Sequence, residues 1–339
     1  MAVPHTPVEI GDPRPGSGVA FTGPADVVGW LARLAGGKRR AIAGRIEKRA
    51  FFTNRSLGLL LITPQLLLIF TFFYWPAGEA LYWAFTLERP WGGGNEWVGL
   101  GNFAAMIGDP VYWNSIWRSG VFALASTGLG MATALLLALL TDRELRGYRI
   151  YRTVLVWPYA IAAPALGMAF RFILAPEAGF MAFVNDIWPG LWNPALDGVD
   201  AMIAIVVAFA WKNVGYNFIF FLAALQAIPR ALIEAAAMDG AGVLRRMRDI
   251  QLPLLAPTLF FLVVINLTDS FTDSFGIVDI MTQGGPARAT ELMVYKIYFD
   301  GFKGLDYSGA AAQSIILMLL VIALTVAQFR FVERRIHYR

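Results

Sequence analysis

The stretch EAAAMDGAGVLRRMRDIQLP (residues 234–253) is a polar, arginine-bearing segment between two long apolar runs. The whole chain of 339 residues is 57% hydrophobic and 15% charged, with a mean hydropathy of +0.56. Ordinary soluble domains are only about 45–50% apolar. The composition therefore predicts a membrane protein in which residues 234–253 form a loop between two spans.

Six apolar runs are long enough to cross a bilayer, which requires roughly 20 residues of helix. None of these runs alternates between apolar and polar residues, so each is expected to be a helix rather than a strand of a barrel. The runs lie near residues 57–75, 121–140, 150–174, 201–225, 254–278 and 311–329. The predicted fold is an all-α membrane protein with a bundle of six transmembrane helices.

Cysteine is absent from the sequence, and the two histidines, His5 and His337, lie in opposite tails. This composition excludes disulfides, thiol chemistry and histidine-based metal catalysis within the membrane domain. No metal site is therefore predicted.

Lysine and arginine are distributed unevenly between the two sides of the predicted bundle. The tails and the second-to-third and fourth-to-fifth connections hold 21 of them, whereas the connections on the other side hold five. Short, positively charged loops stay in the cytoplasm. We therefore expect both termini and the loop at 230–253 on the cytoplasmic side.

The N-terminal tail divides into two parts. Residues 1–24 are rich in proline and glycine and are expected to be disordered. Residues 25–52 have apolar side chains at helical spacing before a basic cluster, which favours a helix on the inner leaflet; a merely solvated basic tail is the alternative. The predicted division is a cytoplasmic tail at 1–56, a membrane domain at 57–333 and a cytoplasmic tail at 334–339.

Two of the predicted spans carry polar side chains, which are costly within a membrane and need a reason. The fourth run contains Lys212, Asn213, Tyr216 and Asn217, and the fifth contains Asn266, Asp269, Ser270 and Asp273. Residues three or four apart lie on one face of a helix, so we expect these faces to turn toward each other or toward a watery cavity. Arg171 on the third run is a further candidate for lining that cavity.

Two interpretations of these polar residues stay open. The preferred one is a solute path lined by Lys212, Asn213, Tyr216, Asn217, Asn266, Asp269, Asp273 and Arg171. The alternative is a buried ion pair between Lys212 and one aspartate that holds the bundle together, since charges within membranes commonly pair with one another. The two interpretations do not exclude each other.

Physical reasoning predicts two short helices in the loop. Strong helix formers occupy 234–239, Gly240 and Gly242 interrupt them, and the helix can resume over 243–250. Leu252-Pro253 is expected to end this second helix and to begin the fifth span. The same pattern also fits a surface hairpin that only separates two spans.

The loop also carries a longer pattern, Glu234-Ala235-Ala236, then Asp239-Gly240-Ala241, then Ile250, Leu252 and Pro253. At every spacing it resembles the EAA signature of membrane subunits of ATP-binding-cassette (ABC) importers, in the carbohydrate-uptake branch of the maltose type. Blocks such as VGLGNF (98–103), WPYAIAAP (157–164) and TQGGPARAT (282–290) are similar to the first permease subunits of sn-glycerol-3-phosphate importers. The resemblance extends from residue 57 to the C-terminus and implies a six-helix permease with cytoplasmic coupling helices.

This resemblance implies partners and a location. In such importers of the bacterial inner membrane, two permeases form one pathway, a soluble binding protein delivers the solute from outside, and two ATPase subunits bind ATP and magnesium. The resemblance implies that Glu234 makes the charged contact with an ATPase, that Gly240 makes the turn, and that Ala235, Ala236 and Ala241 pack closely. The sequence has no GxxxxGK[ST] phosphate loop, so we expect a transport subunit without a cofactor of its own rather than an enzyme. Membrane lipid is an expected partner and nucleic acid is not.

The resemblance implies sn-glycerol-3-phosphate as the solute, with Lys212 as the candidate cation for its phosphate. A glycerophosphodiester, a sugar or another polyol derivative is the alternative within the same family. An ion-coupled secondary carrier that uses Asp269 and Asp273 is a remote alternative, because the EAA loop would have no role in it. A structural membrane scaffold is a third hypothesis.

Overall fold

The computed structural model describes residues 9–11, 18–20, 55–88, 93–141 and 153–332. The chain falls into two units, Met1–Phe73 and Tyr74–Arg339, which we treat separately. The predicted inner-leaflet helix at 25–52 and the C-terminal tail at 334–339 lie outside the described residues.

The first unit contains a short antiparallel pair of strands. Strand β1 (Glu9–Gly11) pairs with strand β2 (Gly18–Ala20), and Ile10 lies opposite Val19. These strands are the described part of residues 1–24, the segment whose composition predicts disorder.

The first predicted span is helical over a longer stretch than its apolar run indicates. Helix α2 (Arg55–Ile69), the π-helical turn η1 (Phe70–Tyr74) and helix α3 (Trp75–Ala84) follow one another along the chain. The stretch Gly58–Ala84 is long and apolar enough to cross a membrane, so the span continues past its predicted end at residue 75. Pro76, whose N–H is missing, lies at the start of α3 directly after the π-helical turn η1.

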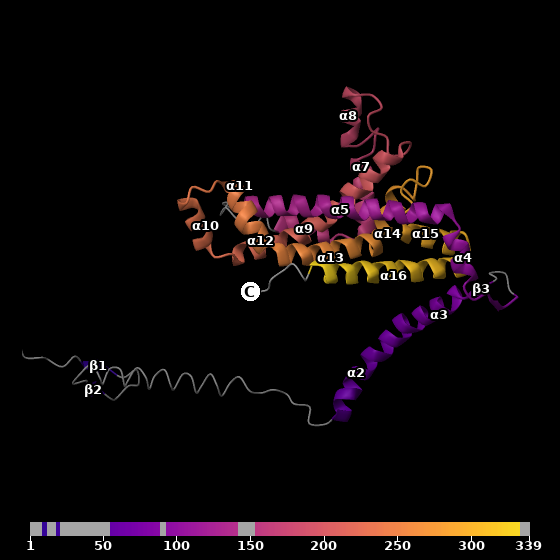
Figure 1. The fold of residues 1–339 in the computed structure, drawn as a ribbon, viewed down its shortest axis with the longest axis horizontal. Helices are drawn as coiled ribbons and strands as arrows, with labels where there is room; N and C mark the ends of the chain where they lie inside the picture. The colour runs from indigo at the N-terminus through magenta and orange to yellow at the C-terminus, as the bar shows by residue number, and fades with distance from the viewer. Residues whose placement is uncertain (1–8, 12–17, 21–54, 89–92, 142–152, 333–339) are drawn as a thin grey trace, which may run out of the picture. The chain divides into compact units, whose positions relative to one another are not determined.

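Four long helices of the second unit lie side by side (Figure 1). They are α5 (Pro110–Thr141), α9 (Gly198–Ala227), α13 (Ala256–Thr272) and α16 (Tyr307–Val332). Helices α5 and α9 approach each other closely at Gly130, where an added Cβ would lie 3.3 Å from the Ala210 carbonyl oxygen. The core between the helices includes Ala134, Phe218 and Leu262, which are completely buried. This packing fixes how the polar faces of α9 and α13 are oriented.

The third predicted span, at 150–174, is broken. Residues Thr153–Ala160, which include the 3-10 turn η2 (Trp157–Ala160), meet helix α7 (Ala163–Ile173) at an angle of 109°. A continuous helix would require a hydrogen bond from residue 164 to the carbonyl of residue 160, and proline at position 164 has no N–H to donate. The predicted span at 150–174 is thus a bent pair of helices, which together are long and apolar enough to count as one span.

The fifth predicted span, at 254–278, is also divided. Helix α13 ends at Thr272, and after Asp273 the chain forms helix α14 (Phe275–Met281). At the other end of α13, the helical stretch Val243–Leu254 meets it at an angle of 69°. Within the described part of the chain, four helices can cross a membrane, or up to six spans if each bent pair counts as one.

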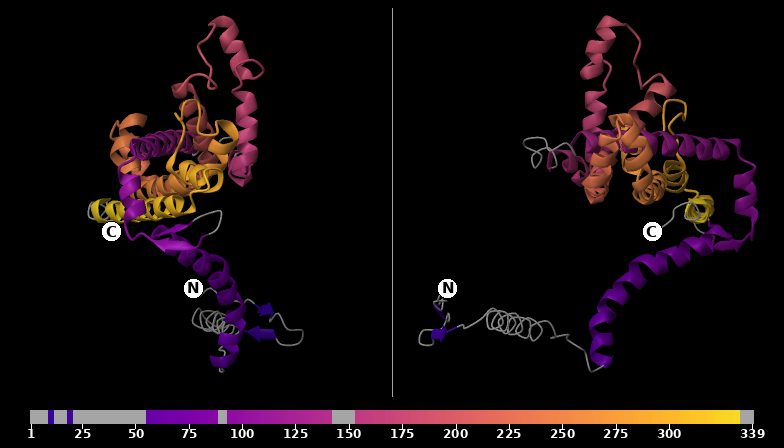
Figure 2. Two further views of the ribbon diagram at one scale, coloured as in Figure 1. Left: turned by 90° about the vertical axis from the view of Figure 1, so that its right-hand side faces the viewer. Right: turned by 60° about the vertical axis from the view of Figure 1, so that its left-hand side comes forward.

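Shorter elements surround the long helices. They are β3 (Thr86–Glu88), β4 (Asn95–Trp97), α4 (Gly101–Ile107), α8 (Phe180–Ile187), α10 (Arg230–Met238), α11 (Val243–Arg246), η3 (Met247–Gln251), α12 (Leu252–Leu254), α15 (Met293–Tyr298) and η4 (Phe299–Lys303). Helices α10 to α12 lie at the opposite end of the long helices from α4 and β3 (Figure 1). Helices α7 and α8 project from the bundle (Figure 2). The loop between α9 and α13 is thus separated from the segments at the other end by the full length of the bundle.

Candidate functional site

A cavity of about 460 Å³ lies where the broken third span meets α9 and α13. One wall is formed by residues 159–163 at the break, and the other carries Lys212 and Asn213 of α9 with Asp269 and Asp273 near the end of α13. The cavity thus brings together four of the eight residues that the sequence analysis assigned to a solute path. Its position at a break in a membrane helix exposes backbone polar groups that a regular helix would hide.

Two features of α9 position the broken third span beside this cavity. The backbone carbonyl of Leu155 lies so close to Gly215 that any Cβ there would collide with it, so the third span can approach α9 only because residue 215 has no side chain. Tyr159 stacks on Tyr216, with ring centroids 5.3 Å apart. Tyr216 therefore supports the cavity wall from behind, one helical turn from Lys212.

Lys212 lies near the middle of α9 and is 8% exposed. Its ammonium group donates to the Oδ2 atom of Asp273, whose side chain is 58% exposed. The Lys212 Nζ atom also lies 5.9 Å from the centre of the Phe209 ring, a cation–π contact. An ion pair of the kind that the sequence offered as an alternative is formed, and its acidic partner remains accessible.

A second polar contact joins α9 to α13. The side-chain amides of Asn217 and Asn266 bond reciprocally at 3.0 and 2.7 Å, and Asn266 also donates to the Leu262 carbonyl oxygen. Both asparagines are buried. The polar faces of the two helices therefore meet, but this pair bonds internally instead of lining the cavity.

Arg171 lies in a different cavity. Its Nη1 atom donates to the Ile280 carbonyl oxygen at 3.0 Å. It lines a space of about 340 Å³ together with residues that follow α7 and residues of the loop after α14. The sequence analysis suggested that Arg171 lines the cavity around Lys212. The structure places it in a different cavity.

The loop between α9 and α13 contains a glycine turn between two helical segments. At the end of α10, the Gly240 N–H donates to the Ala237 carbonyl at 3.1 Å and the Ala241 N–H donates to the Ala236 carbonyl at 2.9 Å. This pair of bonds is a Schellman motif. Gly240 has a φ of +78°, a left-handed conformation that favours glycine.

The second helical segment of the loop runs further than expected. Ile250 lies within η3, and Leu252 and Pro253 lie within α12, so the helical stretch ends at Leu254. The observed end at Leu254 lies one residue past the predicted Leu252-Pro253, and the bend into α13 follows at the completely buried Leu255. A buried pivot thus connects the loop to α13.

The surface of the loop is exposed. The exposed residues of its EAA pattern are Glu234, Ala235, Asp239, Gly240 and Pro253, while Ala236, Ala241, Ile250 and Leu252 are half-buried. Two large apolar side chains beside them are strongly exposed, Met238 at 89% and Leu244 at 73%. Exposed apolar side chains gathered on a polar loop indicate a protein-binding surface.

A polar cluster around Lys296 was not singled out from the sequence. The Lys296 Nζ atom lies 2.9 Å from Asp300 Oδ2 and 3.7 Å from Asp109 Oδ2. Gln313 donates to the same Asp300 oxygen at 2.7 Å. The i,i+4 spacing of Lys296 and Asp300 is a signal that could have found part of this cluster, whereas Asp109 and Gln313 are distant in the sequence.

Comparisons with known proteins agree with this architecture. Residues 128–338 match the family described as "Binding-protein-dependent transport system inner membrane component". The chain is 50% identical over 291 residues to the sn-glycerol-3-phosphate transport system permease protein UgpA of Rhizobium meliloti (strain 1021), which covers 86% of this chain and 99% of the relative. The protein of the same name from Brucella abortus biovar 1 (strain 9-941) is 49% identical with the same coverage.

The fold also matches a solved transporter. The crystal structure of a bacterial ABC transporter involved in the import of the polysaccharide alginate superposes with a TM-score of 0.70 at 22% identity, over 82% of this chain and 95% of that chain. The resemblance to ABC importer permeases that the EAA pattern indicated is thus confirmed by the family match. The chain belongs to the family of binding-protein-dependent transport system inner membrane components, and it is a permease subunit of an ABC importer rather than an enzyme.

Proposed function

We propose that this permease imports sn-glycerol-3-phosphate, as one of two permeases that share one pathway. Both relatives named above carry this solute in their names. The structural observation that carries the proposal is the ammonium group of Lys212, a buried cation in the middle of a membrane helix beside a cavity of about 460 Å³. Such a cation suits a phosphate monoester, because charge-assisted hydrogen bonds to phosphate are strong.

The remaining polar groups of the cavity suit the glycerol part of this solute. A phosphate group would compete with Asp273 for Lys212, and the Asp273 side chain, which is 58% exposed, can stay hydrated when it is displaced. The carboxylates of Asp269 and Asp273 accept hydrogen bonds, so they can bind the hydroxyl groups of glycerol. The amide of Asn213 can both donate and accept. A solute with a phosphate at one end and hydroxyls at the other complements this arrangement better than a sugar without phosphate.

Energy for import enters, in this proposal, through the loop between α9 and α13. Two partner ATPase subunits would bind ATP and magnesium and would dock on α10 to α12, with Glu234 as a charged contact and Met238 and Leu244 as apolar ones. Closure of the ATPases would displace the loop as a unit and tilt α13 about the buried Leu255. Because Asp269 lies on α13, the movement would reach the cavity.

The orientation follows from the charge distribution. Both termini and the loop at 230–253 would lie in the cytoplasm, and a soluble binding protein would deliver the solute on the other side. The alginate transporter supports this arrangement, since one of its structures is a complex with an alginate-bound periplasmic protein. That complex has a TM-score of 0.70 to this chain.

Uptake of labelled sn-glycerol-3-phosphate into vesicles that contain the complete importer tests the solute. We expect uptake that requires ATP and the binding protein and that unlabelled sn-glycerol-3-phosphate suppresses, whereas glycerol and maltose do not. Equal suppression by glycerophosphocholine would favour a diester as the natural solute. Active ATP hydrolysis without uptake of sn-glycerol-3-phosphate would overturn the assignment.

Glu234→Lys tests the coupling role in the same vesicles. Reversal of the charge should abolish stimulated uptake and weaken association of the ATPase subunits, because a docking contact becomes repulsive. Glu177→Lys, the same change at an exposed position between α7 and α8, is the matched control and should leave ATPase association unchanged. Full retention of uptake and ATPase association in Glu234→Lys would remove this residue from the coupling surface.

A further inference from the structure

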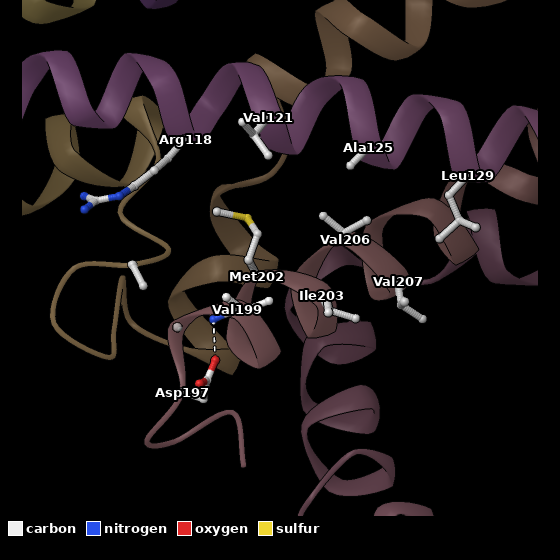
Figure 3. Close-up of a pocket in the computed structure, with 12 residues that line it drawn as sticks. Arg118, Val121, Ala125, Leu129, Asp197, Val199, Met202, Ile203, Val206 and Val207 are labelled. Carbon is white, nitrogen blue, oxygen red and sulfur yellow. Dashed lines mark hydrogen bonds between the residues drawn. The ribbon is translucent and has the colours of Figure 1, made fainter. Parts of the chain in front are cut away.

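An apolar groove of about 680 Å³ runs along the surface between α5 and α9. Its long walls are formed by Val121, Ala125, Leu129, Val199, Met202, Ile203, Val206 and Val207, as Figure 3 shows. The groove is open, and its long walls carry no charged side chain. An open apolar surface of this size in a membrane protein requires an apolar occupant.

One end of the groove carries two charged residues, Arg118 and Asp197 (Figure 3). Asp197 is occupied by its own helix, because its Oδ1 atom accepts from the backbone N–H groups of Val199 and Asp200 at 2.7 and 3.1 Å. The half-buried guanidinium group of Arg118 has no hydrogen bond or ion pair with any residue that the structure describes. Among the residues that the structure describes, Arg118 is thus a cation without an ion-pair partner at the mouth of an apolar groove.

The buried Glu291 does not supply that partner. Arg118 acts electrostatically on Glu291, but Arg288 and Lys296 act on the same carboxylate. Lys296 also has Asp300 and Asp109 as partners, and Glu291, which is 4% exposed, forms no ion pair with Arg118 among the described residues. The Arg118 guanidinium group is therefore available to an anion at the groove.

The dimensions of the groove fit one leaflet of a bilayer. Trp113 and Trp117, which are 54% and 72% exposed, lie beside Arg118 at the start of α5, and exposed tryptophans are typical of the level of lipid head groups. From Arg118 to Leu129 the helix rises by about 16 Å. This is about half of the roughly 30 Å thickness of the hydrocarbon core. A lipid with its head group at Arg118 would therefore lay an acyl chain along the groove to the middle of the membrane.

The groove faces away from the solute cavity. Ile203 precedes Lys212 by about two and a half helical turns, so the two side chains point to opposite sides of α9. If two permeases share the pathway at Lys212, as the proposed function states, the second permease approaches α9 from the other side. We infer that the groove binds an anionic phospholipid of the outer leaflet, with its phosphate on Arg118.

Native mass spectrometry of the complete importer tests this inference. The purified complex is titrated, without solute, with phosphatidylglycerol or phosphatidylcholine, and retained lipids are counted. We expect a preference for phosphatidylglycerol that Arg118→Gln weakens about fivefold, the effect of one cation beside an anionic lipid, and that Arg118→Lys preserves. Ala125→Phe, which fills the groove, should reduce retention of both lipids.

Leu124→Phe is the matched control, since Leu124 is 69% exposed on the same helix and does not line the groove. It should retain lipid as the wild type does. Unchanged phosphatidylglycerol retention in Arg118→Gln and Ala125→Phe would overturn the inference. Loss of the second permease in Ala125→Phe, but not in Leu124→Phe, would also overturn it, because the groove would then be the contact between permeases. If the importer failed to take up sn-glycerol-3-phosphate, only the proposed solute would be overturned, because lipid retention is measured without solute.

Discussion

Lys212 and Lys296 are both nearly buried lysines, with exposures of 8% and 5%, yet their surroundings differ. Lys296 lies between two aspartates, at 2.9 Å from Asp300 and 3.7 Å from Asp109, and Gln313 donates to the same Asp300 oxygen. Lys212 has one aspartate partner, which is mostly exposed, and it borders a cavity of about 460 Å³.

The difference separates a structural lysine from one available to a solute. The cluster around Lys296 connects the start of α5 to α15, η4 and α16, and its carboxylates are only 38% and 23% exposed. The cluster also borders a cavity, of about 210 Å³, but Lys296 already has two acidic partners there, and these charges stabilise the ends of the helices together. A buried cation with one accessible partner can instead exchange that partner for an incoming anion. Burial alone therefore does not distinguish the two roles, whereas the number and exposure of the partners does.

Lys296→Met should have the largest effect on stability. It leaves the carboxylates of Asp300 and Asp109 without their cation in a partly buried site. Breaking a buried ion pair by removing one partner costs about 3–5 kcal/mol, and the partial exposure of these carboxylates favours the lower end, about 3 kcal/mol. The measurement is the thermal unfolding of the purified importer in detergent.

Lys303→Met is the control for this substitution. Lys303 is exposed and contacts the Tyr298 ring, with its Nζ atom 5.7 Å from the ring centre. Its loss should cost under about 1 kcal/mol, as expected for an exposed cation–π contact. Equal melting temperatures for Lys296→Met and the wild type would show that the Lys296 cluster does not stabilise the protein.

Lys212→Met should leave the importer assembled and lower the uptake of sn-glycerol-3-phosphate at least about tenfold, the effect of losing one charge-assisted hydrogen bond to the solute. Asp273 remains hydrated because its side chain is 58% exposed. The measurements are solute uptake into vesicles and size-exclusion chromatography of the complex.

Asp273→Asn separates the two interpretations of Lys212. If Lys212 binds the solute phosphate, this variant keeps the cation and should retain most of the uptake. If the ion pair only holds the bundle together, the two variants should impair assembly equally. If neither Lys212→Met nor Asp273→Asn assembled, Lys212 would have a structural role like that of Lys296.

The sequence predicts the features that depend on local patterns. The excess of lysine and arginine on one side, the four-residue spacing of Lys212 with Tyr216 and of Asn213 with Asn217, and the glycine turn at Gly240 are all readable before the structure. The turn has the backbone conformation that glycine favours, and the polar faces of α9 and α13 do meet. These features come from helical periodicity and from residue-specific backbone freedom, which act within a few residues.

The sequence does not predict the features that depend on distant partners. The break at residues 161–162 lies inside an apolar run whose hydropathy is that of a continuous span, and Pro158 and Pro164 on either side are its local marks. Asp273 shares a helical spacing with Asp269 but lies beyond the end of α13. The cluster around Lys296 joins residues separated by about 200 positions, from Asp109 to Gln313, so no window of sequence contains it. Both lysines are readable as charges, but only their partners assign them different roles.

Glu291 extends the comparison, because it is a buried acid that faces the Lys296 side of the molecule. Burial raises its pKa above the ordinary value, while Arg288, Lys296 and Arg118 oppose the shift. The folded protein thus holds this proton more tightly than the unfolded chain, so stability should fall as the pH rises from about 4.3 toward the raised pKa, by at most about 1.4 kcal/mol per pH unit. Glu291→Gln should remove this slope in thermal unfolding measured across that range. Glu177→Gln, at an exposed acid, should retain it; an unchanged slope in Glu291→Gln would mean that the neighbouring cations outweigh the effect of burial on the pKa of Glu291.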